Sequence, residues 1–289
     1  MSPKPTKQSQ ASASTRSSAL TSFYNRVAQT PSTSTPSPSP SSPQQHHHYK
    51  ARDGLGAYLS DPASQAAAAG SRVVFWDEQF VAIRDLYPKS SVHCLLLARD
   101  PTLRRQHPFD AFGCATPASA ALLDAARSAA LRLRRLVAKE LQRRFGPFSR
   151  LDAAREAALD GNGGAGVNNS DADGQQQQQL PPGRDWESEV LVGVHAHPSM
   201  NDLHVHVLSR EMHSECLRHR RHYNSFHTPF LVPLDDLPLA VDDPRRHPGR
   251  EGYLTRRDLR CWRCGANFGN RFARLKEHLE LEFDEWKRL

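Results

Sequence analysis

The sequence predicts an α+β fold, in which helices pack on an antiparallel sheet, followed by a small C-terminal module. Three observations lead to this prediction. Short apolar runs separated by turn residues stand before and after one long helical pattern, a Cys-x-x-Cys pair lies near the C-terminus, and the remaining segments are polar and of low complexity. Only 38% of the 289 residues are hydrophobic, so we expect a folded part of about 200 residues.

The first segment, residues 1–52, consists mainly of Ser, Pro, Thr, Ala and Gln and includes the run PSTSTPSPSPSSP. Such a segment has too little apolar surface to offset the conformational entropy that folding removes. We therefore predict that residues 1–52 form a disordered tail, which is a candidate to bind a partner protein.

The folded part is predicted to begin near residue 55. A short helix at residues 57–59 should end at Asp61-Pro62, a typical helix stop. Three apolar runs bounded by turn residues follow and are predicted strands, at residues 73–76, 80–83 and 93–97. Their close succession favours an antiparallel meander.

A long helix should follow the meander. Thr116 and Pro117 form the N-cap and first-turn proline that often begin a helix, and Gly146-Pro147 should end it. One face of this helix is apolar, and the arginine-rich opposite face is interpreted as solvent-exposed. The apolar positions are Leu122, Leu123, Ala126, Ala130, Leu133, Val137 and Leu141.

Residues 160–184 are rich in Gly, Asn and Asp and contain five consecutive Gln. This composition predicts a flexible insertion, not a second fold. Strand patterns return at residues 189–194 and 203–208, so the insertion lies inside one α+β domain that spans residues 53–232.

The composition excludes two classes of protein. No run of about 18 apolar residues is present, which excludes a transmembrane helix, and the polar N-terminus has no apolar core of a signal peptide. The five cysteines are odd in number, and only Cys261 and Cys264 are close in sequence. This pattern favours a reducing compartment and a metal site over disulfide bonds. We therefore expect a soluble intracellular protein that makes no use of a membrane.

The C-terminal module, residues 244–289, contains a pattern typical of a small zinc finger. Cys261 and Cys264 precede His278 at finger-like spacing, with apolar residues between them for a small core. The second histidine of a finger is absent, but Glu282 lies one helical turn after His278 and can supply the fourth ligand. A water molecule or Asp284 are the alternatives. Four filled positions would make the zinc structural, and we expect no catalytic metal.

Positive charge gathers around this pair of cysteines. Residues 244–276 contain ten Arg or Lys against two acidic residues, Glu251 and Asp258, which gives a net charge of +8. A polyanion should bind there, because arginines contact phosphates without reading base sequence. The alternative is an ordinary solvent-exposed charged face. The basic residues are Arg245, Arg246, Arg250, Arg256, Arg257, Arg260, Arg263, Arg271, Arg274 and Lys276.

The densest group of reactive side chains is the histidine-rich segment at residues 195–208. Successive side chains of a strand point to opposite faces, so His204 and His206 should lie on one face, roughly 7 Å apart, with an apolar face behind them. Asp202 falls on the histidine face, where its carboxylate is expected to accept an N–H bond from His204 and fix its tautomer.

Two histidines on one strand face have three interpretations. A neutral imidazole is a good nucleophile toward phosphorus, and the phosphoramidate that it forms is labile to water. Alternatively, the pair binds a metal with His195 or His197 as a third ligand, or it forms a polar sheet face. The residue pattern by itself leaves these interpretations open.

Several motifs in order along the chain resemble a known family. The strand Leu203-His204-Val205-His206-Val207 is similar to the signature of the histidine-triad superfamily of nucleotide hydrolases and transferases. The other motifs resemble its aprataxin branch, especially the fungal forms. The resemblance covers residues 53–110 and 189–289, and it does not cover the tail or the Gln-rich insertion. These motifs are VAIRDLYPK at 81–89, HCLLL at 93–97, HAHPSM at 195–200, HYNSF at 222–226 and CWRC at 261–264.

This resemblance implies a histidine-triad fold and a DNA-repair hydrolase that removes AMP from adenylated 5′ ends of nicked or double-stranded DNA. Guanylated ends are a candidate further substrate, which the sequence leaves open. It makes His204 the nucleophile, with His206 and His195 holding the phosphate or serving the leaving group. It also implies a nuclear location. From the sequence we expect a monomer, with a repair protein as a candidate partner of the tail. The implied nucleotide-binding residues are Asp85, Leu86, Lys89, Ser199 and Met200. The implied DNA-binding residues are Arg99, Asp100, Pro101, Thr102, Leu103, His213, Ser214, Arg221 and His222, and Tyr58, Tyr223 and Trp262 are candidates to stack on a DNA end.

One residue departs from the family pattern. Histidine is usual at the position of Asp202, so this chain has two histidines and a carboxylate. Fungal relatives often carry another residue there, so we expect the activity to be intact. Two rival functions are a hydrolase of small nucleotides, which explains neither the finger nor the basic residues, and a non-catalytic zinc-finger DNA-binding protein, which would form no adduct with AMP.

Overall fold

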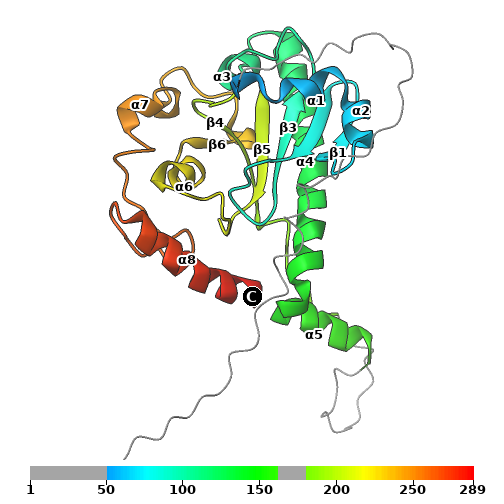
Figure 1. Ribbon diagram of the computed structural model, residues 1–289, viewed down its shortest axis with the longest axis vertical. Coiled ribbons are helices and arrows are strands. Elements are labelled where there is room, and N and C mark those ends of the chain that lie inside the picture. The colour runs from blue at the N-terminus through cyan, green and yellow to red at the C-terminus, as the bar shows by residue number, and fades with distance from the viewer. Residues whose placement is uncertain (1–50, 162–179) are drawn as a thin grey trace, which may run out of the picture. The chain divides into compact units, whose positions relative to one another are not determined.

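The computed structural model describes residues 51–161 and 180–289, which form a six-stranded antiparallel sheet with helices on both faces (Figure 1). The predicted disorder of residues 1–52 and flexibility of residues 160–184 fall almost wholly outside the described residues. The strands are β1 Val73–Trp76, β2 Phe80–Arg84, β3 His93–Ala98, β4 Val190–His195, β5 His204–Ser209 and β6 Leu231–Pro233. The helices are α1 Gly56–Ser60, α2 Pro62–Ala67, α3 Pro108–Ala111, α4 Pro117–Phe145, α5 Arg150–Leu159, α6 Arg220–His227, α7 Pro248–Glu251 and α8 Phe272–Lys287.

The strands follow the order β1-β2-β3-β5-β4-β6, and each neighbouring pair is antiparallel. The first three strands form the predicted meander. The last strands extend it in a different order from the chain, because β5 pairs with β3 on one side and β4 on the other. This central place buries all six residues of β5, so both faces of the histidine strand lie inside the protein.

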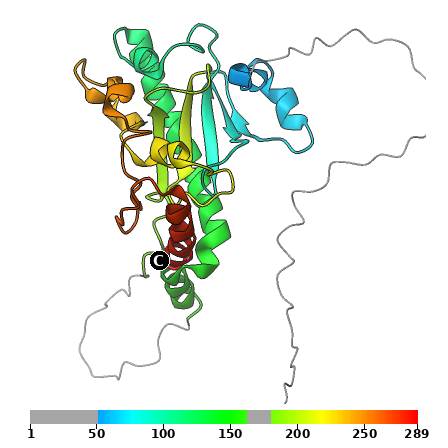
Figure 2. The same ribbon diagram turned by 60° about the vertical axis from the view of Figure 1, so that its left-hand side comes forward.

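Helix α4 covers one face of the sheet, as Figure 2 shows. It begins where the sequence predicts, because the side chain of Thr116 accepts a hydrogen bond from the backbone N–H of Ser119, and Pro117 occupies the first turn. All seven predicted apolar positions are buried. They pack on Leu96, Val205 and Val207 in the main hydrophobic core.

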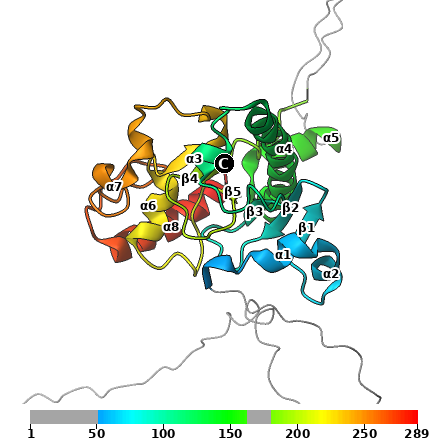
Figure 3. The ribbon, with the colours of Figure 1, turned by 90° about the horizontal axis from the view of Figure 1, so that it is seen from above.

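The opposite face of the sheet carries α1 and α2 over its first strands, as Figure 3 shows. Leu55 and Leu59 pack there on Ile83, Leu95 and other strand residues. The predicted helix stop is correct for α1, which ends at Ser60. The same residues also begin α2, because the Asp61 side chain accepts a hydrogen bond from the backbone of Ser64, a step that the sequence analysis did not predict.

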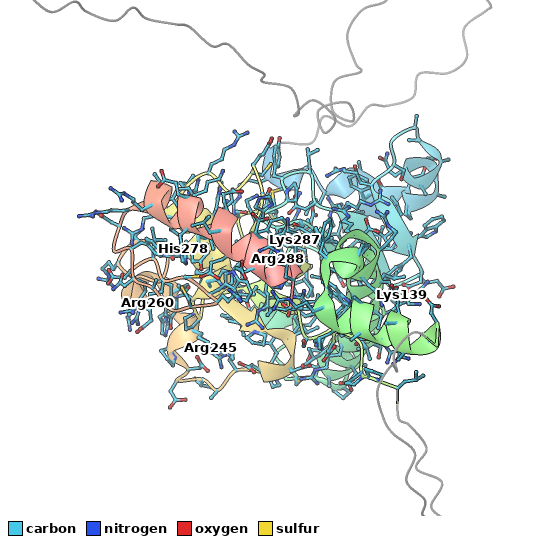
Figure 4. The ribbon with its side chains drawn as sticks, turned by 90° about the horizontal axis from the view of Figure 1, so that it is seen from below. Lys139, Arg245, Arg260, His278, Lys287 and Arg288 are labelled. Atoms are coloured by element: carbon cyan, nitrogen blue, oxygen red, sulfur yellow. The ribbon has the colours of Figure 1, made fainter. Side chains whose placement is uncertain are left out.

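The C-terminal segment packs against the sheet domain instead of standing apart from it. A second core joins Leu208 of β5 and Tyr223 of α6 to Leu259, Leu275 and other residues of the C-terminal segment. At its far end, α8 lies beside the junction of α4 and α5, where Figure 4 labels Lys287 and Arg288. The Ser149 hydroxyl donates to the backbone carbonyl of Leu289 at 2.7 Å.

Aromatic side chains hold this end of α8. The Trp286 ring is fully buried and contacts Phe145 and Trp186, with ring centroids 5.4 and 5.9 Å away. Its indole N–H donates to the Glu189 carboxylate at 2.7 Å. The C-terminal segment is therefore attached to the sheet domain both near the cysteines and at Trp286.

Besides α2, helices α3, α5, α6 and α7 were not predicted from the sequence. Helix α5 is short and largely exposed, with Asp152 as its buried residue, and α6 is so polar that its pattern resembles a loop. Both are stabilised by contacts that are distant in sequence. Within the described ranges, none of the helices combines the length and the apolar character that crossing a membrane requires.

Candidate active site

The two histidines of β5 lie on the face of the sheet opposite α4. The register places His204 across from Leu97 and His206 across from Leu95, so all four side chains share that face. The two imidazole centroids are 4.9 Å apart, closer than the spacing expected along a strand because the rings incline toward each other. As predicted, the alternating apolar side chains point the other way, into the core under α4, namely those of Leu203, Val205 and Val207.

The ring of His204 is oriented by the backbone. Its Nδ1 lies 2.7 Å from the carbonyl oxygen of Asp202. A carbonyl only accepts, so Nδ1 carries the proton and Nε2 is left with its lone pair. The prediction that the Asp202 carboxylate would contact the imidazole is wrong. Instead, that carboxylate pairs with Nε of Arg104, because a buried negative charge is unfavourable without a cation beside it.

A chain of hydrogen bonds orients the second histidine. The backbone N–H of Lys89 donates to Nδ1 of His93 at 3.2 Å, so Nε2 of His93 carries the proton. That Nε2 lies 3.0 Å from Nδ1 of His206 and donates to it. In the neutral ring of His206, Nε2 is then the N–H group. The Asp85 carboxylate lies 3.5 Å from Nδ1 of His93 and acts on that ring through its charge, not through a hydrogen bond.

His93 is a site residue that the sequence analysis quoted only as part of a motif. It is buried, and its side chain bonds to His206 of the paired strand β5. In the sequence, His93 is a polar residue at the start of an apolar strand. This pattern by itself does not distinguish a functional residue from an ordinary residue at a strand end.

His195 completes the histidine group from the end of β4. Its ring centroid is 4.2 Å from that of His206. The Nε2 atoms of His195 and His206 are both buried, and neither has a hydrogen-bond partner among the described residues. Buried ring nitrogens that lack partners favour a ligand that would satisfy them.

A cavity of about 630 Å³ opens in front of these histidines. It brings together all the predicted nucleotide-binding residues and the three predicted catalytic histidines. Leu55 and Phe226 supply part of its apolar wall. The predicted residues that line it are Asp85, Leu86, Lys89, His195, Ser199, Met200, His204, His206, Arg221 and His222.

The other predicted DNA-binding residues lie outside this cavity. Residues 99–103 form an exposed or half-buried turn after β3, in which Asp100 caps the backbone of Thr102. His213 follows β5, stacks on Phe283 of α8 and bonds to Glu280 at 2.8 Å. The Ser214 hydroxyl donates to the carbonyl of Pro88. Contact of these residues with DNA stays a prediction.

Burial sets the charge of the site. It lowers the pKa of His204, and it lowers the pKa values of His195 and His206 far below the usual value of 6.5. All three rings are therefore neutral near pH 7. Burial also opposes ionisation of Asp85, but the neighbouring His93 and a backbone N–H outweigh it, so the pKa of Asp85 is lowered. The site thus offers neutral nitrogens beside one carboxylate.

Acid should destabilise the folded protein, because burial lowers the pKa of His93 from 6.5 to about 4. Between these values the unfolded chain binds more protons than the folded chain, so stability rises with pH in this window. We expect the free energy of unfolding to fall by on the order of 3 kcal/mol through His93 as the pH drops across it. Urea denaturation at stepwise pH measures this fall, which His93→Gln should reduce. Equal pH dependence in both proteins would contradict the expectation.

The four predicted zinc ligands meet at the start of α8. The ligand atoms of Cys261, Cys264, His278 and Glu282 all lie within 4.8 Å of one another. The Cys264 Sγ atom is 3.2 Å from Nε2 of His278, and that nitrogen is 3.0 Å from Oε1 of Glu282. These separations approach the edges of about 3.3–3.8 Å expected around tetrahedral zinc. Two sulfurs, a nitrogen and an oxygen therefore fit a closed zinc site.

The second oxygen of that glutamate is also occupied. Arg263 donates to Oε2 of Glu282 at 2.5 Å, which orients Oε1 toward the other ligands. Several of the predicted basic residues are exposed around this site, among them Arg260, Arg271 and Arg274, and Figure 4 labels Arg260 and His278 on this side of the molecule.

The structure separates the three aromatic candidates for stacking on a DNA end. Tyr223 is buried, and its hydroxyl donates to the carbonyl of Arg260, so its ring is not available. Trp262 is half-buried beneath the guanidinium of Arg210. Tyr58 is half-buried on α1, with its hydroxyl accepting from the Arg72 guanidinium at 2.6 Å. Tyr58 and Trp262 remain the candidates.

Comparisons with known proteins agree with this geometry. Residues 67–213 match the model of the HIT domain, and residues 227–285 match that of the C2HE / C2H2 / C2HC zinc-binding finger. The chain is 32% identical over 240 residues to an aprataxin-like protein of Schizosaccharomyces pombe, covering 81% of this chain and 82% of that protein. It is 33% identical over 234 residues to an aprataxin-like protein of Saccharomyces cerevisiae, covering 81% and 96%.

A solved structure is similar over the same length. The crystal structure of the aprataxin ortholog Hnt3 in complex with DNA superposes with a TM-score of 0.59 at 29% identity, covering 81% of this chain and 96% of that one. A complex of Hnt3 with DNA and guanosine gives a TM-score of 0.57 at 28% identity, with the same coverage.

Proposed function

The chain belongs to the aprataxin family and is thus a DNA-repair hydrolase that acts on a nucleotide phosphate linkage, and we propose that its substrate is DNA with AMP attached to a 5′ phosphate. One observation carries the proposal. The Nε2 lone pair of His204 is made available by the bond from Nδ1 to Asp202, and it lies in a cavity beside two buried ring nitrogens without partners among the described residues.

The reaction has two steps. Nε2 of His204 attacks the phosphorus of AMP, and the bond from that phosphorus to the oxygen of the DNA 5′ phosphate breaks, so the DNA leaves with its phosphate. The imidazole of the adduct carries a positive charge, which the Asp202 carbonyl stabilises at Nδ1. Water then attacks the same phosphorus, which releases AMP and restores the neutral ring.

The two other histidines act on the phosphate. His206 lines the cavity, and its Nε2 carries the N–H group because His93 donates to its Nδ1. It can donate to a phosphate oxygen or to the leaving oxygen, and its strength as a donor grows as negative charge develops there. His195, packed against His206, has the other buried Nε2. Its Nδ1 bonds to the backbone of Ser225, so this Nε2 carries a lone pair in the neutral ring and can accept a hydrogen bond from the attacking water.

The remaining cavity residues suit a nucleoside. The Asp85 carboxylate can accept hydrogen bonds from both ribose hydroxyls. Leu86 and Met200 supply apolar surface for the base. Lys89, with its ammonium at the cavity, can contact the phosphate. We extend the proposal to guanylated ends, because the related Hnt3 binds guanosine together with DNA.

The finger holds the DNA in this proposal. Cys261, Cys264, His278 and Glu282 would bind a structural zinc that ties the loop after Leu259 to α8. The exposed arginines around it would then contact backbone phosphates. We propose further that the protein is a monomer, that it works without a catalytic metal, and that it is located in the nucleus, where its substrate would arise.

Substrate choice tests the proposed function. The purified protein should release AMP from a nicked duplex with an adenylated 5′ end much faster, by about 100-fold in kcat/KM, than it cleaves diadenosine polyphosphates, because only the duplex reaches the finger. Chromatography of the released AMP measures both rates. Equal or faster cleavage of the free dinucleotide would favour a small-nucleotide hydrolase, and no AMP from either would favour a non-catalytic DNA-binding protein.

A further inference from the structure

Asp202 connects the nucleophile to a residue that none of the sequence motifs identifies. Its backbone carbonyl accepts the Nδ1 proton of His204, and its carboxylate pairs with Nε of Arg104. We propose that Arg104 is a positioning residue for His204, because it neutralises the Asp202 carboxylate and thereby holds the carbonyl that orients the nucleophile. This inference rests on the proposed function in taking His204 as the nucleophile.

The carboxylate needs this partner because water does not reach it. The Asp202 side chain is 0% exposed, whereas that of Arg104 is 22% exposed. A buried carboxylate without a cation is strongly unfavourable. Its Oδ2 atom has no hydrogen-bond partner within the described part of the chain, so the interaction with Arg104 through Oδ1 is the contact that keeps the charged side chain in place.

Arg104 also holds the strand through its backbone. Its carbonyl accepts from the N–H of Leu203 at 2.7 Å, and the carbonyl of Leu203 accepts from the N–H of Ala98 at 3.1 Å. Arg104 thus contacts residues 202 and 203, immediately before the nucleophile. Since a side-chain substitution leaves the backbone contact intact, it isolates the effect of the guanidinium on Asp202.

The charged groups around His204 determine the direction in which its pKa should move when Arg104 is replaced. In the cavity, Asp85, Lys89, His93, His195 and His206 face the ring, and these stay unchanged when Arg104 is replaced. On the other side, Asp202 faces both His204 and Arg104. Without the guanidinium, the carboxylate charge acts on His204 unopposed and favours the imidazolium form, which is not a nucleophile.

The test compares Arg104→Met with Arg105→Met on 5′-adenylated nicked DNA. Arg105 is a matched control, because it is the next residue, its side chain is 69% exposed, and it pairs with Asp53 instead of Asp202. Arg104→Met should lose about 10- to 100-fold in kcat with little change in KM, and the acidic limb of its kcat/KM profile should move to higher pH. Arg105→Met should behave as the unaltered protein does.

A double variant separates positioning from loss of folding. Arg104→Met with Asp202→Asn contains no unpaired buried charge, and the backbone at position 202 still offers its carbonyl, so this variant should fold by circular dichroism and recover most of the lost kcat. Asp202→Asn alone should move the acidic limb to lower pH. These two variants decide the question even if Arg104→Met does not fold.

Several outcomes would overturn the inference. The first is equal kcat and equal pH profiles for Arg104→Met and Arg105→Met. The second is a double variant that folds but is as slow as Arg104→Met. The third is an acidic limb of the kcat/KM profile that does not move in Asp202→Asn. If the unaltered protein releases no AMP, the proposed function fails, but the inference is still tested by nitrogen-15 NMR of the histidine rings, with His204→Ala for assignment. An unchanged tautomer and pKa of His204 in Arg104→Met would then refute it.

Discussion

Replacement of His204 by alanine is expected to abolish AMP release from 5′-adenylated nicked DNA, with turnover falling by about 10⁴-fold or more. His204 lines the cavity, and its Nε2 lone pair is free because a backbone carbonyl holds the proton at Nδ1. DNA affinity should persist, because the finger and its arginines are untouched. Chromatography of released AMP and a binding titration with nicked duplex measure the two properties separately.

The matched control is His247→Ala, which removes an exposed histidine of the C-terminal segment and should turn over normally. The adduct gives an independent measurement. Mixing the unaltered protein with substrate and denaturing it at alkaline pH, where phosphoramidates persist, should leave AMP on the peptide that contains His204. Normal turnover by His204→Ala, or AMP found on another side chain, would remove the mechanism.

Loss of the zinc site is expected to weaken binding to nicked duplex by about 10- to 100-fold, since the finger's phosphate contacts depend on its fold. In Cys261→Ala the site lacks a thiolate, and a structural zinc contributes about 10 kcal/mol or more to folding of a small finger. Cys261 is itself buried in the core that joins the C-terminal segment to β5. The loop between Leu259 and α8 should therefore lose its structure, which circular dichroism would detect.

The attachment of α8 through Trp286 limits this effect. Because Trp286 packs on Phe145 and Trp186 far from the cysteines, the sheet domain should stay folded, and kcat at saturating DNA should fall less than KM rises. The control is Cys114→Ser, a half-buried cysteine outside the finger, which should bind as the unaltered protein does. Chelation or Cys261→Ala without effect on DNA affinity would defeat the role of the finger.

Local signals identified most of the sheet and its long helix. The strand runs and the cap at Thr116 are confirmed, because apolar periodicity and N-cap chemistry act over a few residues. Helix α6 was missed for the converse reason. Its polar sequence forms a helix because Tyr223 and Phe226 pack on residues from distant parts of the chain, and no local pattern reports such contacts.

In the histidine site, too, some features could be predicted from the sequence and others only from the structure. The alternation of β5 placed His204 and His206 on one face, and spacing brought together the four zinc ligands, so these features depend on the sequence alone. The bond of His204 is to the carbonyl two residues before it, so it depends on the backbone conformation of that turn, which the residue pattern did not report. The donation from His93 and the pairing of Asp202 with Arg104 depend on tertiary structure, because they reach the histidine strand from β3 and from the loop after it, and only the pairing of β3 with β5 brings these atoms within hydrogen-bonding distance.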